Sequence, residues 1–218
     1  MVHILLYIAL TWLVLMPSRF RAMEKGYRKT SLALKALPTA LAAAFAAAGY
    51  LGTDVRDLYG LMIFIGLCVC TLADIALDIK FEVGGALFFA GHVIYVTALS
   101  QYRVLSWWCL TVFAIALVGL WFFALRYRRY FPKPHLLAGV LVYVVALAAL
   151  LAFSLPLPLL APSARSTLAA LGAVTFVLSD MTLCHNTLLN RPAPYHFVSL
   201  GIYYMAQLLL ALSAFPPA

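Results

Sequence analysis

Charged residues are scarce in this sequence, and acidic residues are the scarcest. Asp and Glu together number seven in 218 residues, charged residues of both signs make up 10%, and hydrophobic residues make up 66%. A soluble domain needs a densely charged surface, so this composition excludes one. Long apolar runs recur along the whole chain, and a helix that spans a bilayer needs about 20 such residues. We predict a single integral-membrane domain over residues 1–218.

Several motifs of enzymes and metal sites are missing. The four cysteines lie in apolar runs without a Cys-x-x-Cys pair, so they predict neither a disulfide nor a zinc site. The sequence has no Gly-x-Ser-x-Gly, no His-Glu-x-x-His and no phosphate-binding glycine loop. We expect no cofactor and no metal, although Asp74, His92 and Asp180 could in principle ligate a metal together.

The apolar runs divide the chain into eight predicted spanning helices. The predicted spans cover residues 2–17, 31–50, 58–79, 84–100, 105–125, 136–154, 167–189 and 197–215. The connections between them are short, and short connections join antiparallel neighbours. The predicted fold is therefore an all-α bundle of eight transmembrane helices.

Basic residues fall mainly on one side of this predicted bundle. The first, third, fifth and seventh connections contain eleven Lys and Arg, whereas the opposite side has three. Connections rich in Lys and Arg stay in the cytoplasm. We therefore predict that both termini lie outside, and we expect the membrane to be a bacterial inner membrane. The same distribution explains the net charge of +8 without a nucleic-acid partner.

Ionisable side chains inside the predicted spans share one depth. Asp74 and Asp78 lie near the end of the third span, His92 in the fourth and Asp180 in the seventh. With this orientation, all of them fall within about one to three helical turns of the cytoplasmic face. Ionisable groups at membrane depth are costly and mark functional sites. We predict a polar pocket, containing the active site, that opens toward the cytoplasmic leaflet.

The two carboxylates of the third span are candidate catalytic groups. Asp74 and Asp78 are four residues apart and so share one helix face. Burial and mutual repulsion both disfavour two charges there, so the pair can keep one proton and act as a general acid. Alternatively, Asp78 is a solvated carboxylate beside Lys80, and Asp74 forms a structural ion pair with Lys35. Asp180 fits a catalytic or substrate-polarising role, or a structural one.

Other polar residues at this depth are candidates for binding a substrate. Lys35 could snorkel to the interface, hold a lipid phosphate or pair with Asp74. A buried Gln207 amide needs polar partners, while tyrosines near an interface can also form an aromatic belt. His92 is a candidate for the catalytic site, and His185 and His196 are interpreted as interfacial. The candidate substrate-binding residues are Lys35, Tyr95, Tyr203, Tyr204 and Gln207.

A short sequence motif around two of these carboxylates occurs twice in the chain. Leu72-Ala-Asp, followed by Leu77, recurs as Leu178-Ser-Asp, followed by Leu183, four spans later and in the same orientation. A parallel repeat of two four-helix halves would account for this match.

The order and spacing of these motifs resemble a known family. The run from Leu72 to Leu77 is followed by a Phe-x-x-Gly-x-x-x-Phe-x-x-x-His-x-x-Tyr block that ends at Tyr95. With Lys35-Ala-Leu-Pro, Ser179-Asp and Tyr203-Tyr-Met-Ala-Gln, these motifs resemble those of the YhhN-like, or lysoplasmalogenase, family. Ala73 is a departure, because the family usually has Gly before the first Asp.

The resemblance implies an eight-span membrane enzyme with a lysophospholipid substrate, in contact with membrane lipids. Such enzymes hydrolyse the vinyl ether bond of lysoplasmalogens and release a fatty aldehyde and glycerophospho-ethanolamine or -choline. With that chemistry, we expect Asp74 to be the acid and Asp180 to stabilise the cation or activate water, although the reverse assignment also fits. His92 would orient the acid or the water. Lys35 would attract the phosphate, and Tyr203 and Gln207 would place the headgroup.

Two other functions remain open from the sequence. A lipid or small-molecule transporter would also use a buried carboxylate relay, and it would need a polar track that reaches the outer face. A structural helix bundle with buried ion pairs would need its carboxylates for stability alone.

Overall fold

The structure, a computed structural model, describes residues 2–52, 57–131 and 133–215. Within them, eight helices are long and apolar enough to cross a membrane, which confirms the predicted number and the all-α fold. The helical elements, in chain order, are α1 (Val2–Ala9), the π-helical η1 (Leu10–Leu15), α2 (Met16–Glu24), α3 (Arg28–Leu51), α4 (Leu58–Ile79), α5 (Phe81–Ser100), α6 (Trp107–Arg126), the 3₁₀ turn η2 (Arg128–Tyr130), α7 (Pro134–Ser154), α8 (Leu157–Leu160), α9 (Ala164–Leu188) and α10 (Ala193–Ser213).

The helices begin and end where local chemistry satisfies their free backbone groups. The Asp57 side chain accepts from the backbone N–H of Gly60 at the start of α4, and Ser163 forms a reciprocal capping box with Ser166 at the start of α9. Gly26, with φ of 73°, allows the tight turn between α2 and α3. Hydrophobicity does not detect these polar first and last turns, so several helices extend a few residues beyond the predicted spans.

The first span shows the largest difference from the predicted boundaries. Elements α1, η1 and α2 form one helical span from Val2 to Glu24, whereas the prediction ended at residue 17. Arg19, which the sequence assigned to a connection, therefore lies on a helix and is buried. The prediction was wrong here because charge alone was taken as the sign of a connection.

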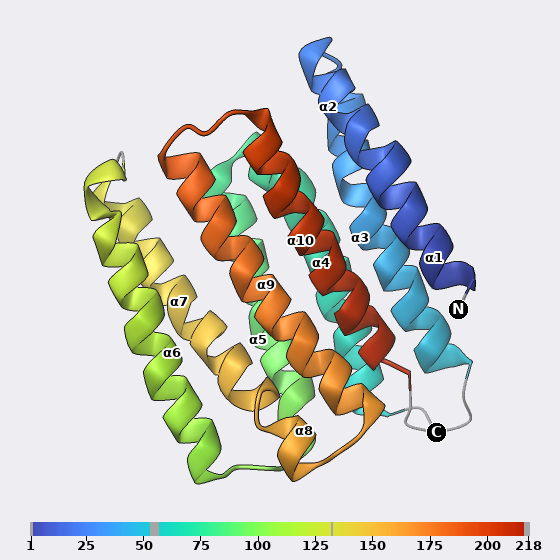
Figure 1. Cartoon of the computed structure of the whole chain (residues 1–218), viewed down its shortest axis with the longest axis vertical. Coiled ribbons are helices and arrows are strands. Elements are labelled where there is room, and N and C mark those ends of the chain that lie inside the picture. Colours follow the sequence, from blue (N-terminus) through green and yellow to red (C-terminus); the bar gives the residue numbers. More distant parts are fainter. Residues whose placement is uncertain (1, 53–56, 132, 216–218) are drawn as a thin grey trace.

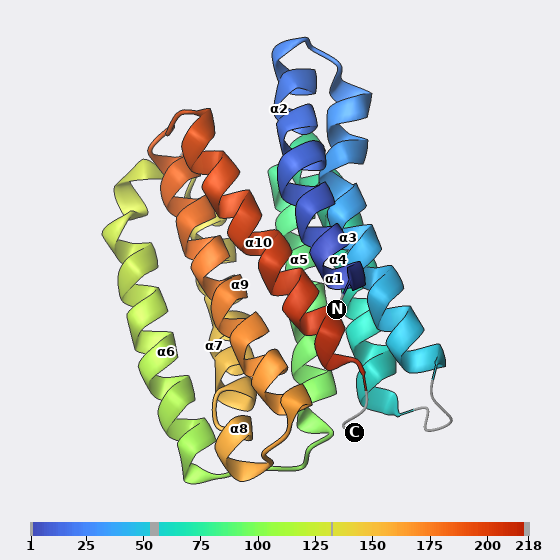
Figure 2. The same ribbon diagram turned by 45° about the vertical axis from the view of Figure 1, so that its right-hand side comes forward.

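Antiparallel neighbours pack side by side, as Figure 1 shows. Helices α4 and α5 form one pair and α9 and α10 another, while α3 packs against both α4 and α10. The pair α6 and α7 lies at one edge and joins the rest through α5 and α9, and the α1–α2 span lies at the opposite edge (Figures 1 and 2). The start of α1 and the end of α10 lie toward one end of the bundle (Figure 1). We call the other end, with the α2–α3, α4–α5, α6–α7 and α9–α10 connections, the basic end.

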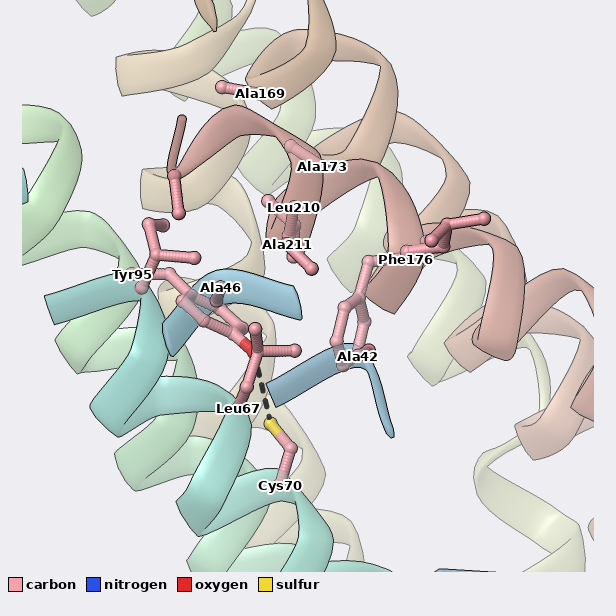
Figure 3. Close-up of a cluster of buried hydrophobic side chains, with 14 of the residues drawn as sticks. Ala42, Ala46, Leu67, Cys70, Tyr95, Ala169, Ala173, Phe176, Leu210 and Ala211 are labelled. Atoms are coloured by element: carbon pink, nitrogen blue, oxygen red, sulfur yellow. Dashed lines mark hydrogen bonds between the residues drawn. The ribbon is translucent and has the colours of Figure 1, made fainter. Parts of the chain in front are cut away.

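The core between α3, α4, α5, α9 and α10 combines small and aromatic side chains (Figure 3). Small residues let helices approach closely in a membrane protein, and the fully buried alanines here include Ala42, Ala46, Ala169, Ala173 and Ala211. A Cβ at Gly66 of α4 would overlap the ring of Tyr95 on α5. This close approach brings the Tyr95 hydroxyl to 3.6 Å from the Cys70 sulfur and fixes the ring against α4 (Figure 3).

Candidate active site

A cavity of about 720 Å³ lies at the basic end, with walls from α2, α3, α4, α5, α9 and α10. Asp74 and Asp180 both line it, as do Lys35, Asp78 and Tyr203. The prediction that the two carboxylates from distant helices share one cavity is therefore confirmed. The other walls are largely apolar, with Phe20, Leu32, Leu77, Phe81, Leu183 and Leu200 among the lining residues.

Asp74, at the centre of the first cluster, is 1% exposed. Its Oδ2 atom accepts hydrogen bonds from the Thr39 hydroxyl at 2.6 Å and from the Tyr203 hydroxyl at 3.0 Å. Within the described part of the chain, Oδ1 has no hydrogen-bond partner. One oxygen is thus held by two donors from α3 and α10, and the other remains available to a ligand in the cavity.

A second layer of side chains orients Tyr203. The Gln207 Nε2 atom donates to the Tyr203 hydroxyl at 2.8 Å, and the Tyr95 hydroxyl donates to Gln207 Oε1 at 3.0 Å. Because Tyr203 accepts from Gln207, its own hydroxyl hydrogen is directed to Asp74. Gln207 is fully buried, and these bonds satisfy its amide. Tyr95 and Gln207 therefore act through Tyr203 and lie behind the cavity wall.

Asp180, at the centre of the second cluster, has a side chain that is 16% exposed. The Tyr143 hydroxyl of α7 donates to Asp180 Oδ2 at 2.6 Å. His92 Nδ1 lies 2.6 Å from the Phe88 carbonyl oxygen, and because a carbonyl only accepts, Nδ1 carries the hydrogen. His92 Nε2 is buried with no hydrogen-bond partner among the described residues, and it lies 4.0 Å from Asp180 Oδ2. A neutral His92 thus presents an acceptor beside Asp180.

Aromatic rings lie between the two clusters. Phe176 contacts His92 with ring centroids 4.5 Å apart and Tyr203 at 5.6 Å, and Phe88 contacts Tyr203 at 5.7 Å. All three contacts are edge-to-face, the preferred geometry for aromatic pairs. Phe88 also lines the cavity. Phe88 therefore contributes an apolar side chain to the cavity wall, and Phe176 packs behind it.

The third carboxylate has different partners. Asp78 Oδ1 lies 2.5 Å from Lys35 Nζ, and Asp78 Oδ2 lies 3.0 Å from Arg19 Nη2. The hypothesis of an ion pair between Lys35 and Asp74 is wrong, because the Lys35 ammonium instead pairs with Asp78, which lies one helical turn nearer the basic end. Nor is Asp78 simply a solvated carboxylate beside Lys80. Both of its oxygens accept from cations, so it is not positioned to share a proton with Asp74.

The other candidate residues have varied surroundings. Tyr204 donates to the Lys35 carbonyl oxygen at 2.7 Å and so holds α10 against α3. In the described structure, the cavity-lining residues do not include Tyr204, Gln207, Tyr95 or His92. His196, interpreted as interfacial, lines the cavity, whereas His185 bonds to the Tyr127 hydroxyl at 2.8 Å.

Sequence reasoning missed three residues of the site: Arg19, Thr39 and Tyr143. Tyr143 is a lone phenol within the predicted sixth span, a signal that could have marked it. Thr39 follows the Lys35-Ala-Leu-Pro motif directly, which was a weaker signal. No local signal pairs Arg19 with Asp78, because the two are 59 positions apart.

The side chains of the two clusters are not arranged as a metal site. Across residues 2–52, 57–131 and 133–215, no group of three or more His, Cys, Asp or Glu side chains could hold a metal ion. Asp74, His92 and Asp180 therefore do not form the ligand set that the sequence left open.

Comparison with known proteins supports the motif resemblance. The family model of the YhhN family matches residues 30–214, which is most of the chain. The chain belongs to the YhhN family. This family includes lysoplasmalogenases. The match contains both carboxylate clusters, whereas Arg19 lies outside it. No curated protein and no solved structure matches the chain significantly.

Proposed function

We propose that this YhhN-family protein hydrolyses the vinyl ether bond of a lysoplasmalogen, either lysoplasmenylethanolamine or lysoplasmenylcholine. The products are a fatty aldehyde and the glycerophospho-base. The proposal depends chiefly on one observation: Asp74 and Asp180 line the same cavity. In each, a tyrosine hydroxyl holds Oδ2, while Oδ1 has no hydrogen-bond partner in the described residues.

The reaction needs an acid, a carboxylate and a water. A proton adds to the vinyl carbon remote from the ether oxygen, and the π electrons form the new C–H bond. The resulting oxocarbenium ion is attacked by water at the carbon next to oxygen. The hemiacetal then loses a proton from its hydroxyl, its C–O bond to glycerol breaks, and the glycerol oxygen takes a proton. General acid–base groups and a nearby negative charge lower these barriers.

We assign the proton to Oδ1 of Asp74, because Thr39 and Tyr203 both donate to Oδ2 and would stabilise the carboxylate left after transfer. Asp180 would stabilise the cation and accept a proton from the attacking water. His92 lies behind the cavity wall with Nε2 4.0 Å from Asp180 Oδ2, and it would act on the reaction by positioning Asp180. The two carboxylates could exchange these roles, since each offers one free oxygen. Because both oxygens of Asp78 pair with cations, we assign Asp78 to substrate binding and not to catalysis.

The position of the cavity favours an enzyme over a transporter. Its lining residues come from the halves of the helices near the basic end, from Arg19 and Arg28 to Asp180 and Tyr203. A transport path would need lining groups that continue to the opposite end. We place the basic end on the cytoplasmic side of a bacterial inner membrane and both termini outside, in accordance with the excess of Lys and Arg in its connections.

The test is aldehyde release by the purified protein in detergent with lysoplasmenylethanolamine. Asp74→Asn and Asp180→Asn should each lower kcat by about 10²-fold or more if the carboxylates transfer protons. Asp57→Asn is the matched control, because Asp57 pairs with Arg165 at the opposite end and should affect stability only. Full activity of either cavity variant would remove that residue from the mechanism, and no release by the unmodified protein would refute the function. Inhibition by a chelator would instead indicate a metal-dependent reaction.

A further inference from the structure

Two buried cations share a single carboxylate on the cavity wall. Arg19 is 7% exposed and Lys35 is 5% exposed, and both line the cavity. Asp78 accepts from both of them, at 3.0 and 2.5 Å. When Asp74 carries the proton that the proposed function assigns to it, this cluster has one surplus positive charge. An unpaired charge is costly in a buried setting, so the cluster favours a further anion.

The same cations have hydrogen-bond donors to spare. Arg19 Nε is buried and has no partner within residues 2–52, 57–131 and 133–215. Lys35 has three N–H donors, and one of them is used by Asp78. A guanidinium beside an ammonium can donate to several oxygens of one phosphate group. Arg28, which also lines the cavity, adds a third basic side chain to this wall.

The other carboxylates that line the cavity would repel an anion, so an anion would bind at the wall that contains Arg19 and Lys35. The remaining carboxylates that line it are Asp74 and Asp180. Asp180 is held by Tyr143 on α7 and therefore belongs to the other cluster. A lipid anion that approached Asp180 would meet a carboxylate that forms no ion pair with a Lys or Arg among the described residues. Near Arg19 and Lys35 the anion would meet two cations.

We propose that Arg19 and Lys35 bind the phosphate group of the lysophospholipid, and that Asp78 holds the two cations in position while the phosphate is absent. The identity of the lipid rests on the proposed function, but the phosphate site does not depend on catalysis. Asp78 and the phosphate compete for the same donors, so Asp78 weakens phosphate binding. This role assigns a function to Arg19, which the family match does not include.

The experiment measures binding without hydrolysis. A 1-O-alkyl glycerophosphoethanolamine has no vinyl ether and cannot react, and 1-O-alkylglycerol with the same chain lacks the phosphate. Affinities of both ligands are measured in nanodiscs for the unmodified protein and its variants. The unmodified protein should prefer the phosphate ligand by about tenfold or more, and Arg19→Gln should lose most of that preference while its affinity for alkylglycerol is unchanged. Equal affinity of the unmodified protein for both ligands would overturn the proposal.

Two further variants separate the proposal from a purely structural role. Asp78→Asn should raise affinity for the phosphate ligand severalfold, because the cations lose their competitor. Unchanged or weaker binding would overturn the role of Asp78, even if Arg19→Gln fails to fold. Arg21→Gln is the matched control, since Arg21 is an exposed arginine on the same helix and should bind as the unmodified protein does.

A third arm identifies the source of the phosphate. Inorganic phosphate should displace the alkyl phospholipid only at far higher concentration than the lipid itself, because it lacks the chain that the apolar walls hold. Displacement at equal concentration would assign the site to free phosphate and overturn the lipid assignment. Preferential binding without aldehyde release would refute the proposed function alone, whereas aldehyde release without this preference would refute the phosphate site alone.

Discussion

Replacing Tyr203 by Phe removes one hydroxyl from the catalytic cluster and leaves its ring in place. The hydroxyl donates to Asp74 Oδ2 at 3.0 Å and accepts from Gln207 Nε2 at 2.8 Å. The ring packs against Phe88 and Phe176, and these contacts do not involve the hydroxyl. We therefore expect Tyr203→Phe to change the chemistry of Asp74 without changing the shape of the cavity.

The expected magnitude follows from the geometry at Oδ2. A hydrogen bond to a carboxylate contributes about 1.5–3 kcal/mol. Thr39 still donates to the same oxygen at 2.6 Å, so part of this stabilisation remains. We expect a loss of about 1–2 kcal/mol of transition-state stabilisation, or about 5- to 30-fold in kcat. The rate falls because the bond stabilises the carboxylate that forms when Asp74 gives up its proton.

The assay is kcat for aldehyde release by Tyr203→Phe, Thr39→Val and the double variant. Because both donors converge on one oxygen, the double variant should lose more than the two single losses combined, by about 0.5 kcal/mol or more. Tyr59→Phe is the control. The Tyr59 hydroxyl lies 2.8 Å from the Ser213 hydroxyl and does not line the cavity, so kcat should stay within about twofold. An unchanged kcat for Tyr203→Phe, or equal loss in the Tyr59 control, would refute the reasoning.

Three further predictions concern the second carboxylate, the packing and the topology. Tyr143→Phe should lower kcat by about 5-fold or more with little change in KM, because Tyr143 holds Asp180 Oδ2 at 2.6 Å; an effect on KM alone would show a binding role instead. Gly84→Ala should lower the melting temperature in detergent, at a cost of about 1–3 kcal/mol, because its Cβ would overlap the Leu77 backbone. Gly85→Ala has open space and should be neutral, so equal melting of the two variants would contradict the packing. Alkaline phosphatase fused to the C-terminus should be active in a bacterial host, and an inactive fusion would reverse the orientation.

Much of the bundle could be predicted because the membrane constrains the chain so strongly. Apolar runs of sufficient length indicate spans, and alternating direction then fixes which end of the bundle each residue approaches. Asp74 and Asp180, more than a hundred positions apart, could be placed at one depth by this reasoning alone. Their shared cavity follows from packing α4 and α9 into one bundle, which the short connections already favoured.

The partners of those carboxylates could not be predicted in the same way. Whether a hydroxyl such as Thr39 faces Asp74 depends on the rotation of α3 about its axis, which hydrophobicity in a wholly apolar setting does not determine. Arg19 was misplaced because a charged residue after an apolar run can either end a helix or continue it toward a buried partner. Its partner, Asp78, lies on another helix, so only the packed structure distinguishes these cases.

The central claim is that a side chain of this cavity delivers a proton to the vinyl carbon. Hydrolysis of lysoplasmenylethanolamine in D₂O, with the aldehyde trapped by reduction and analysed by mass spectrometry, tests it most directly. Protonation of the vinyl carbon should leave one deuterium on the carbon next to the former carbonyl, and Asp74→Asn should lose the product. An aldehyde without deuterium at that carbon, or a shortened aldehyde formed by oxidative cleavage, would contradict it.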